Sequence, residues 1–155
     1  MVLLKHLRRY DLFDFMGEKE LEAVAAIAKE NEYQEGDVII EAGQPADTFY
    51  FLVDGNVAYY FVVTIAHDPY YEKEYHISDI GPGEIFGISA LIEPFKYTAT
   101  LRVDKPSRVI EIGASDLRAL CEADPKLAYG LMQAVAKVAI KRRQATRIQL
   151  IAARV

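Results

Sequence analysis

The segment from Gly81 to Leu91 has the residue types that bind an anion with the protein backbone. Glycines stand at 81, 83 and 87, and the short run Ile88 to Leu91 follows the last of them. This order is typical of a strand that ends at a glycine and continues into a short helix. The first N–H groups of a helix have no partner within it, and the helix dipole places partial positive charge there. The segment therefore predicts an anion-binding turn, with Gly87 to Leu91 as the start of the helix.

Other groups that could do chemistry are few. The three histidines are His6, His67 and His76, and the last two lie on either side of a predicted hairpin break. A metal enzyme built on a β-barrel needs several histidines and a carboxylate on adjacent strands. The sequence has neither that cluster nor a nucleophile with a neighbouring base. The single cysteine, Cys121, lies in a helical pattern that favours a packing role. We therefore expect no enzyme activity, no metal and no required cofactor.

The elements that must hold this turn differ in period along the chain. Apolar residues at 21, 24, 25 and 28 predict a first helix over roughly Glu18 to Asn31. From Tyr33 to Gly113, short apolar segments alternate with turn residues, as in a β-sandwich or jelly-roll barrel. A tight turn is predicted at 54–56 and another at 104–107. The predicted strands are Val38–Ile40, Phe49–Val53, Val57–Ile65, Tyr71–Ile80, Thr98–Val103 and Val109–Ile112.

Helical period returns after Gly113. A short helix around residues 117–121 is followed by Asp124 and Pro125, which suit the N-cap and the first position of another helix. That helix is predicted to run to about Arg154. At ~1.5 Å per residue it would be roughly 45 Å long and would extend beyond the barrel. Such a helix usually pairs with a second copy, so we predict a homodimer. Its apolar stripe is Leu127, Leu131, Val135 and Val138, continued by Ile148 and Ile151.

Charge is divided unevenly along the chain. All 23 acidic residues precede Pro125, and from there to Val155 the chain has seven basic residues and no acidic one. The net charge of −5 thus combines −12 on the body with +7 on the tail. The tail is either a basic helix docked on an acidic surface, its own or a partner's, or a nucleic-acid surface, and we favour the first. We expect no DNA-binding domain, no membrane span and a cytoplasmic protein.

The segment Tyr33 to Gly55 resembles the first half of a cyclic nucleotide-binding domain, the sensor of catabolite activator-like regulators, kinase regulatory subunits and nucleotide-gated channels. Gly36, Gly43, Asp47, Tyr50 and Gly55 stand where that family places its turn residues. Gly81-Pro82-Gly83-Glu84-Ile85-Phe86-Gly87 is similar to the family's entry into its phosphate-binding turn, which Ala90-Leu91 and Thr98-Ala99-Thr100 continue. Residues 86–100 are called the phosphate-binding turn below. The resemblance covers about residues 10 to 140.

The resemblance implies one domain over residues 1–155 that is mainly β with flanking helices. It implies a double-stranded β-helix (jelly-roll) barrel at about 33–113, preceded by an N-terminal helix and followed by C-terminal helices at about 114–154. Family members place a glutamate, for the ribose 2′-hydroxyl, directly after the Phe-Gly pair, and an arginine, for the cyclic phosphate, ten residues after the glycine. Here these positions hold Ile88 and Tyr97. The implied ligand-binding residues are Phe86, Gly87, Ile88, Ser89, Ala90, Leu91, Tyr97, Thr98 and Ala99.

The two missing side chains lower the expected affinity for cyclic nucleotides. A hydrogen bond to a charged group is worth about 1.5–3 kcal/mol. Loss of two such bonds removes roughly 3–6 kcal/mol, or about two to four decades of affinity. We therefore expect cyclic AMP and cyclic GMP to bind weakly, with another small anionic ligand as the alternative, between the turn and the start of the C-terminal helix. Two functions follow: a regulatory sensor, or a ligand-free module that dimerises or recruits a protein partner through the basic helix.

Overall fold

The computed structural model of the chain describes residues 2 and 4–154. The sheet has the strand order β1-β6-β3-β4, with β2 paired to β6 and β5 paired to β3, and the pairings are antiparallel. The mainly β jelly-roll barrel with flanking helices is therefore as predicted. The elements are α1 (Leu4–Leu7), η1 (Asp11–Phe13), α2 (Glu18–Ile27), β1 (Ala28–Tyr33), β2 (Val38–Ile40), β3 (Thr48–Ile65), β4 (Asp68–Ile80), β5 (Ile85–Phe86), η2 (Ile88–Leu91), β6 (Thr100–Gly113), α3 (Ala114–Ala123) and α4 (Pro125–Ala153).

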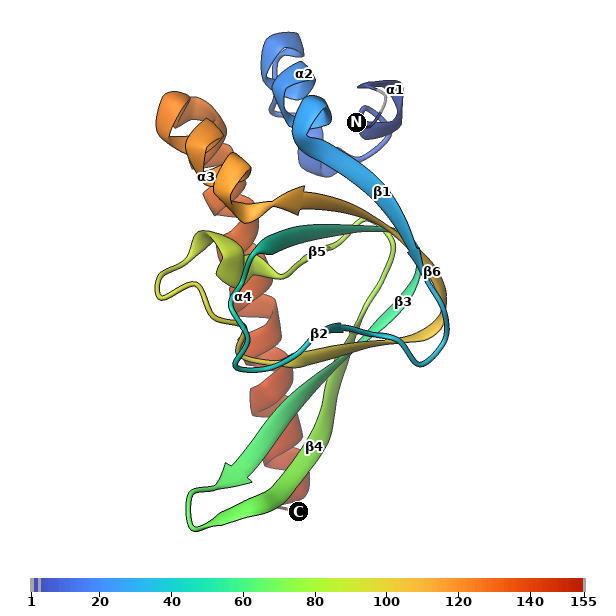
Figure 1. Cartoon of the computed structure of the whole chain (residues 1–155), viewed down its shortest axis with the longest axis vertical. Coiled ribbons are helices and arrows are strands. Elements are labelled where there is room, and N and C mark those ends of the chain that lie inside the picture. The colour runs from blue at the N-terminus through green and yellow to red at the C-terminus, as the bar shows by residue number, and fades with distance from the viewer. Residues whose placement is uncertain (1, 3, 155) are drawn as a thin grey trace.

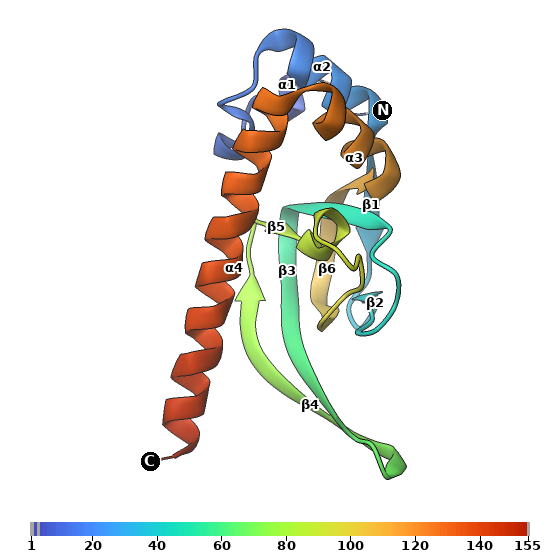
Figure 2. The same cartoon turned by 90° about the vertical axis from the view of Figure 1, so that its left-hand side faces the viewer.

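The N-terminal helices and α3 gather at one end of the barrel, while α4 runs along its side (Figures 1 and 2). At the opposite end, the hairpin of β3 and β4 and the last turns of α4 both extend beyond the barrel (Figure 2). The barrel interior is filled by large apolar side chains that alternate with exposed ones along the strands, as expected for a sheet with one buried face. Fully buried members include Phe49, Phe51, Phe86, Val57 and Ile110.

Two predicted tight turns are wrong, because both segments lie inside long strands. β3 continues through 54–56, and β6 continues through 104–107. The pairing of β3 with β6 shifts register at Asp54, Asn56 and Val57, so the extra residues form bulges. Asn56 stabilises this region, because its side-chain amide donates to the carboxylate of Asp104 at 3.0 Å. The turn-type residues thus mark an irregular stretch of two paired strands.

The first helix is shorter than predicted. α2 begins at Glu18 as expected but ends at Ile27, and the next six residues form β1, paired with β6. A buried carboxylate explains the change, since Glu111 on β6 accepts hydrogen bonds from Asn31 Nδ2 at 2.9 Å and from Tyr33 Oη at 2.7 Å. A strand over this segment satisfies that carboxylate, and a buried charge without such partners is costly.

The predicted start of the long C-terminal helix is confirmed. Pro125 is the first residue of α4, and the side chain of Asp124 accepts a hydrogen bond from the Leu127 N–H at 3.1 Å. Leu127, Leu131 and Val135 are buried against the body, whereas the apolar residues of the second half are exposed. None of the helices in the described part of the chain is long and apolar enough to span a membrane.

We expect Asp124→Ala to destabilise the protein by about 1 kcal/mol, the usual worth of an N-cap side chain. The melting temperature should fall by about 2–4 °C, as for a loss of this size in a chain of 155 residues. Asp124→Asn is the matched control, because its amide oxygen can still accept from the Leu127 N–H. Thermal unfolding followed by circular dichroism measures both. Equal melting of the alanine variant and the wild type would show that the cap contributes nothing.

Candidate functional site

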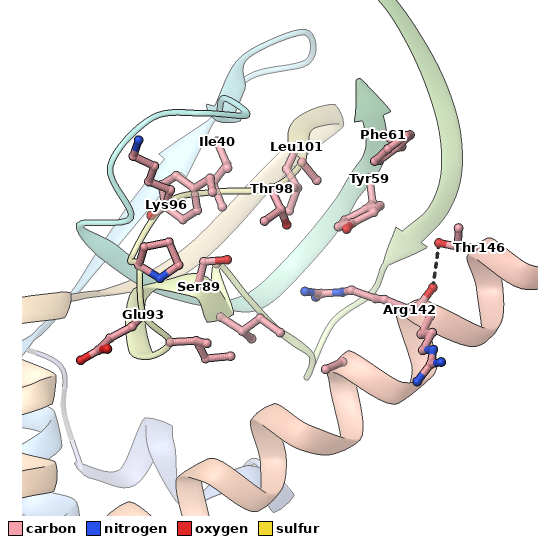
Figure 3. A pocket seen from close by; sticks show the side chains of 18 residues that line it. Ile40, Tyr59, Phe61, Ser89, Glu93, Lys96, Thr98, Leu101, Arg142 and Thr146 are labelled. Carbon is pink, nitrogen blue, oxygen red and sulfur yellow. Dashed lines mark hydrogen bonds between the residues drawn. The ribbon is translucent and has the colours of Figure 1, made fainter. Parts of the chain in front are cut away.

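A cavity of about 460 Å³ lies between the phosphate-binding turn, strand β3 and helix α4. In Figure 3, α4 forms the wall opposite Tyr59, Thr98 and Leu101. Most of the surface is apolar, and the polar groups come mainly from the turn and from α4. The lining residues are Ile40, Tyr59, Phe61, Gly87, Ile88, Ser89, Ile92, Glu93, Pro94, Lys96, Tyr97, Thr98, Ala99, Leu101, Ala139, Arg142, Arg143 and Thr146.

Gly87 sets the direction of the phosphate-binding turn. Its φ of 68° lies in the left-handed region, which disfavours residues with a side chain. A Cβ atom there would lie 2.8 Å from Cδ2 of Tyr50 and 3.0 Å from the carbonyl oxygen of Thr48. The helix η2 starts at the next residue, and the Ala90 N–H donates to the Gly87 carbonyl at 3.1 Å. The short helix predicted after Gly87 is therefore confirmed.

Tyr97 occupies the position of the family's arginine without offering a charge to the cavity. Its hydroxyl donates to the carbonyl oxygen of Thr48 at 2.6 Å and accepts from the Thr48 N–H at 3.2 Å. The residue is buried, and burial raises the pKa of its hydroxyl to about 12. Because the hydroxyl bonds both backbone groups of Thr48, the Tyr97 side chain links the turn to β3.

A second fastening comes from α3. Arg118 donates from Nη1 to the carbonyl oxygen of Ala90 at 2.6 Å, at the end of η2. Its guanidinium also lies 4.2 Å from the centroid of the Phe95 ring, a cation–π distance. Phe95 has a φ of 57°, which is unusual for a residue with a side chain. The phosphate-binding turn is thus tied to β3 on one side and to the helix preceding α4 on the other.

The nine candidate residues fall into two groups. Gly87, Ile88, Ser89 and the segment 97–99 line the cavity. Phe86 and Ala90 have no exposed surface, and Leu91 packs against the core. Phe86 stacks on Tyr50 with ring centroids 4.8 Å apart, so its place is behind the turn. Contact of any of these residues with a ligand stays a prediction.

Two parts of the cavity lining were not predicted from the sequence. Tyr59 and Phe61 come from β3, and four residues come from the middle of α4, at 139, 142, 143 and 146. We expected the ligand to enter near the start of the C-terminal helix. The cavity instead borders α4 well beyond that start. The four α4 positions follow helical spacing, so they share one face. Nothing in their local sequence indicates that this face meets the turn.

Arg142 is a cationic residue that is partly buried between α4 and the barrel. It donates from Nη2 to the carbonyl oxygen of Ile85 at 2.7 Å, and its Cζ lies 5.5 Å from the centroid of the Tyr59 ring. Burial lowers the pKa of its guanidinium. The neighbouring Lys141 forms an ion pair with Glu84. The basic helix thus docks on its own barrel through two adjacent residues.

Metal-ligating side chains are dispersed over the described residues. No three histidine, cysteine, aspartate or glutamate side chains among them lie close enough to hold a metal ion. Of the hairpin histidines, His76 pairs with Asp79 at 2.8 Å on the exposed surface. Apart from the carboxylate of Glu93, the polar side chains that line the cavity are hydroxyl groups and cations.

Comparison with known proteins identifies the family. Residues 30–124 match the model of the cyclic nucleotide-binding domain. The chain therefore belongs to this family of ligand-binding regulatory domains, as the turn residues and the phosphate-binding turn predicted.

Particular relatives cover several contexts. The chain is 26% identical to a cyclic nucleotide-gated potassium channel of Mesorhizobium japonicum, over 86% of the chain and 33% of the channel. It is 28% identical to the cAMP-dependent protein kinase regulatory subunit of Dictyostelium discoideum, over 77% of the chain and 33% of the subunit. The chain thus spans about a third of these curated relatives. The solved structure of a candidate cyclic nucleotide-binding protein from Geobacter metallireducens superposes with a TM-score of 0.77 at 30% identity, over 92% of the chain and 98% of that protein.

We expect Tyr97→Phe to destabilise the domain by about 1–3 kcal/mol, because it leaves the N–H and carbonyl of Thr48 without their partner. Tyr59→Phe is the matched control, since this tyrosine also packs against the core but its hydroxyl has no hydrogen bond to the described residues. Urea unfolding at equilibrium measures both. Equal losses in the two variants would contradict the proposed role of the Tyr97 hydroxyl.

Proposed function

We propose that the chain is a non-catalytic regulatory module that senses a small ligand in this cavity, with weakened or altered specificity for cyclic nucleotides. One observation carries the proposal. The cavity stays open beside the phosphate-binding turn while Ile88 and Tyr97 occupy the positions of the family's glutamate and arginine. The ligand site is retained in shape and altered in chemistry.

Helix α4 is the proposed relay. Ala139, Arg142 and Thr146 line the cavity, so a ligand there contacts α4 directly. A ligand shifts a conformational equilibrium only by its difference in affinity for the two states. A ligand in this cavity therefore favours the helix position in which these residues contact it. The proposed output of the domain is therefore a change in the position of α4.

We expect cyclic AMP and cyclic GMP to bind the wild type no tighter than the high-micromolar range, by calorimetry. The double change Ile88→Glu with Tyr97→Arg supplies the two side chains that the family uses. It should tighten binding by at least about tenfold, because each contact to a charged group is worth about 1.5–3 kcal/mol.

The control is Ile88→Leu with Tyr97→Phe, which removes the same bonds to Thr48 without adding charge and should not tighten binding. The double variant must first be shown to fold, since Tyr97→Arg removes both bonds to Thr48. Sub-micromolar binding by the wild type would overturn the proposed weakening. A folded double variant that gains no affinity would show that the backbone of the turn has departed from the family.

The second candidate function is a module that dimerises through α4. Ile140, Ile148 and Ile151 are 59%, 65% and 64% exposed, and their spacing of eight and three places them on one helix face. An exposed apolar face at the end of a long helix is typical of a surface that pairs. A protein partner is the other occupant that this function allows, and a cytoplasmic location stays a prediction from composition.

We expect the wild type to be a homodimer by light scattering after gel filtration, and Ile148→Asp to shift it to the monomer at the same concentration. Gln149→Asp is the matched control, because it adds the same charge at the adjacent exposed position and removes no apolar surface. A wild type that is monomeric at high concentration would exclude the homodimer. Equal dissociation by the two variants would show that charge alone separates the copies.

A further inference from the structure

Arg142 brings a positive charge into the wall of the cavity. The guanidinium is partly shielded from solvent by Tyr59 and by the β5 backbone, with the carbonyl of Ile85 at 2.7 Å and the Tyr59 centroid at 5.5 Å. Burial lowers the pKa of this group, which is the direction expected when a cation loses water. A cation in such a place gains stability from an anion or from strong hydrogen bonds.

The acidic side chain whose charge acts on Arg142, Glu84, already has two other partners. Glu84 forms an ion pair with Lys141 and also accepts a hydrogen bond from the Gly81 N–H. The charge of Glu84 also acts on Arg142, but among the residues that the structure describes no carboxylate lies within ion-pair distance of its guanidinium. A guanidinium has several N–H donors, and the bond to Ile85 uses one of its nitrogens. The remaining donors are available to a ligand that enters the cavity.

The surroundings of Arg142 suit an anion attached to an apolar body. Arg143 lines the same wall, and the hydroxyl groups of Ser89 and Thr98 lie across the cavity (Figure 3). The acidic residue of the lining, Glu93, points away from Arg142 in Figure 3. The rest of the surface is aromatic and aliphatic and includes Tyr59. The charged group of an organic anion could therefore bind the arginines of α4, while its apolar body packs against β3.

We propose that the cavity binds a small molecule with one anionic group on an apolar aromatic body, and that Arg142 of α4 binds this group. The inference rests on the proposed sensor function and names the ligand class. The family's charge at position 97 is replaced by a charge on another element, since Tyr97 is fastened to Thr48 and Arg142 faces the same cavity. Guanidinium suits the task, because its planar fork matches carboxylate, sulfonate and phosphate oxygens.

The location of this charge has a mechanical consequence. An anion held by the phosphate-binding turn alone would stabilise the turn, whereas an anion held by Arg142 links the turn to α4. The bond from Arg142 to Ile85 need not break, because other donors of the group can reach the ligand. Ligand binding therefore fastens α4 more firmly to the barrel.

Two fluorescent probes with nearly the same aromatic body test the proposal. Anilinonaphthalene sulfonate carries one negative charge, and phenylnaphthylamine lacks the sulfonate. We expect the full chain to bind the sulfonate more tightly. Arg142→Gln should lower the affinity for the sulfonate by about ten- to a hundredfold, which is the contribution of a hydrogen bond between charged groups. The affinity for phenylnaphthylamine should not change.

Three variants make the result specific. Arg142→Lys keeps the charge and should recover much of the lost affinity. Arg147→Gln removes an exposed charge on the same helix outside the cavity lining and should change neither probe. Ala139→Trp fills the cavity and should weaken both probes, which shows that they bind there. Circular dichroism confirms that each variant is folded.

The two probes and four variants distinguish failure of the ligand class from failure of the sensor function. A loss of sulfonate affinity confined to Arg142→Gln, with rescue by lysine, supports the proposal. Equal sulfonate binding by the wild type and Arg142→Gln overturns it, while sensitivity of both probes to Ala139→Trp would leave the sensor function standing. If neither probe binds the wild type, the open cavity does not take ligands of this class, and both the proposed function and this inference fail.

Discussion

The phosphate-binding turn depends on a single stretch of backbone, the peptide groups of Thr48 at the start of β3. At the beginning of the turn, the carbonyl oxygen of Thr48 and the ring of Tyr50 crowd the space that a side chain at residue 87 would need. The same oxygen and the Thr48 N–H bond the hydroxyl of Tyr97 near its end. Backbone groups held in a long paired strand are rigid supports, so both ends of the turn are fixed relative to the barrel. The wall of the cavity that the turn forms is therefore anchored to the barrel through Tyr97 and Thr48.

This constraint changes what the substitution at position 97 means. An arginine there would have to leave the backbone of Thr48 to other partners or to water, whereas the tyrosine satisfies both groups at once. On the register that the resemblance implies, the tyrosine thus exchanges the family's charge for two hydrogen bonds to the barrel. Arg118 adds to these contacts from α3 by bonding the Ala90 carbonyl and covering Phe95. The turn is therefore held at several points, and α4 is the part of the cavity wall that we propose to move.

The sequence predicted the fold and the turn because their signals are local. Glycine at 87 followed by a short apolar run, and Asp124 before Pro125, each depend on a few neighbouring residues. The end of α2 could not be found in this way, because it depends on Glu111, about eighty residues away. The bulges of β3 and β6 likewise follow from their pairing. Arg142 carries no local signal for its role, since only the docking of α4 brings it beside Tyr59.

The uneven charge of the chain has a specific physical consequence at this site. Lys141 and Arg142 turn toward the acidic body, where one pairs with Glu84 and the other lies against β5. An exposed ion pair such as the first contributes little, so it orients the helix without holding it strongly. The partly buried guanidinium is more sensitive to what stands beside it, because electrostatic interactions strengthen as water is excluded. Because this partly buried charge borders the cavity, the proposed effect of a small anion is to change how firmly the second half of α4 is held against the barrel.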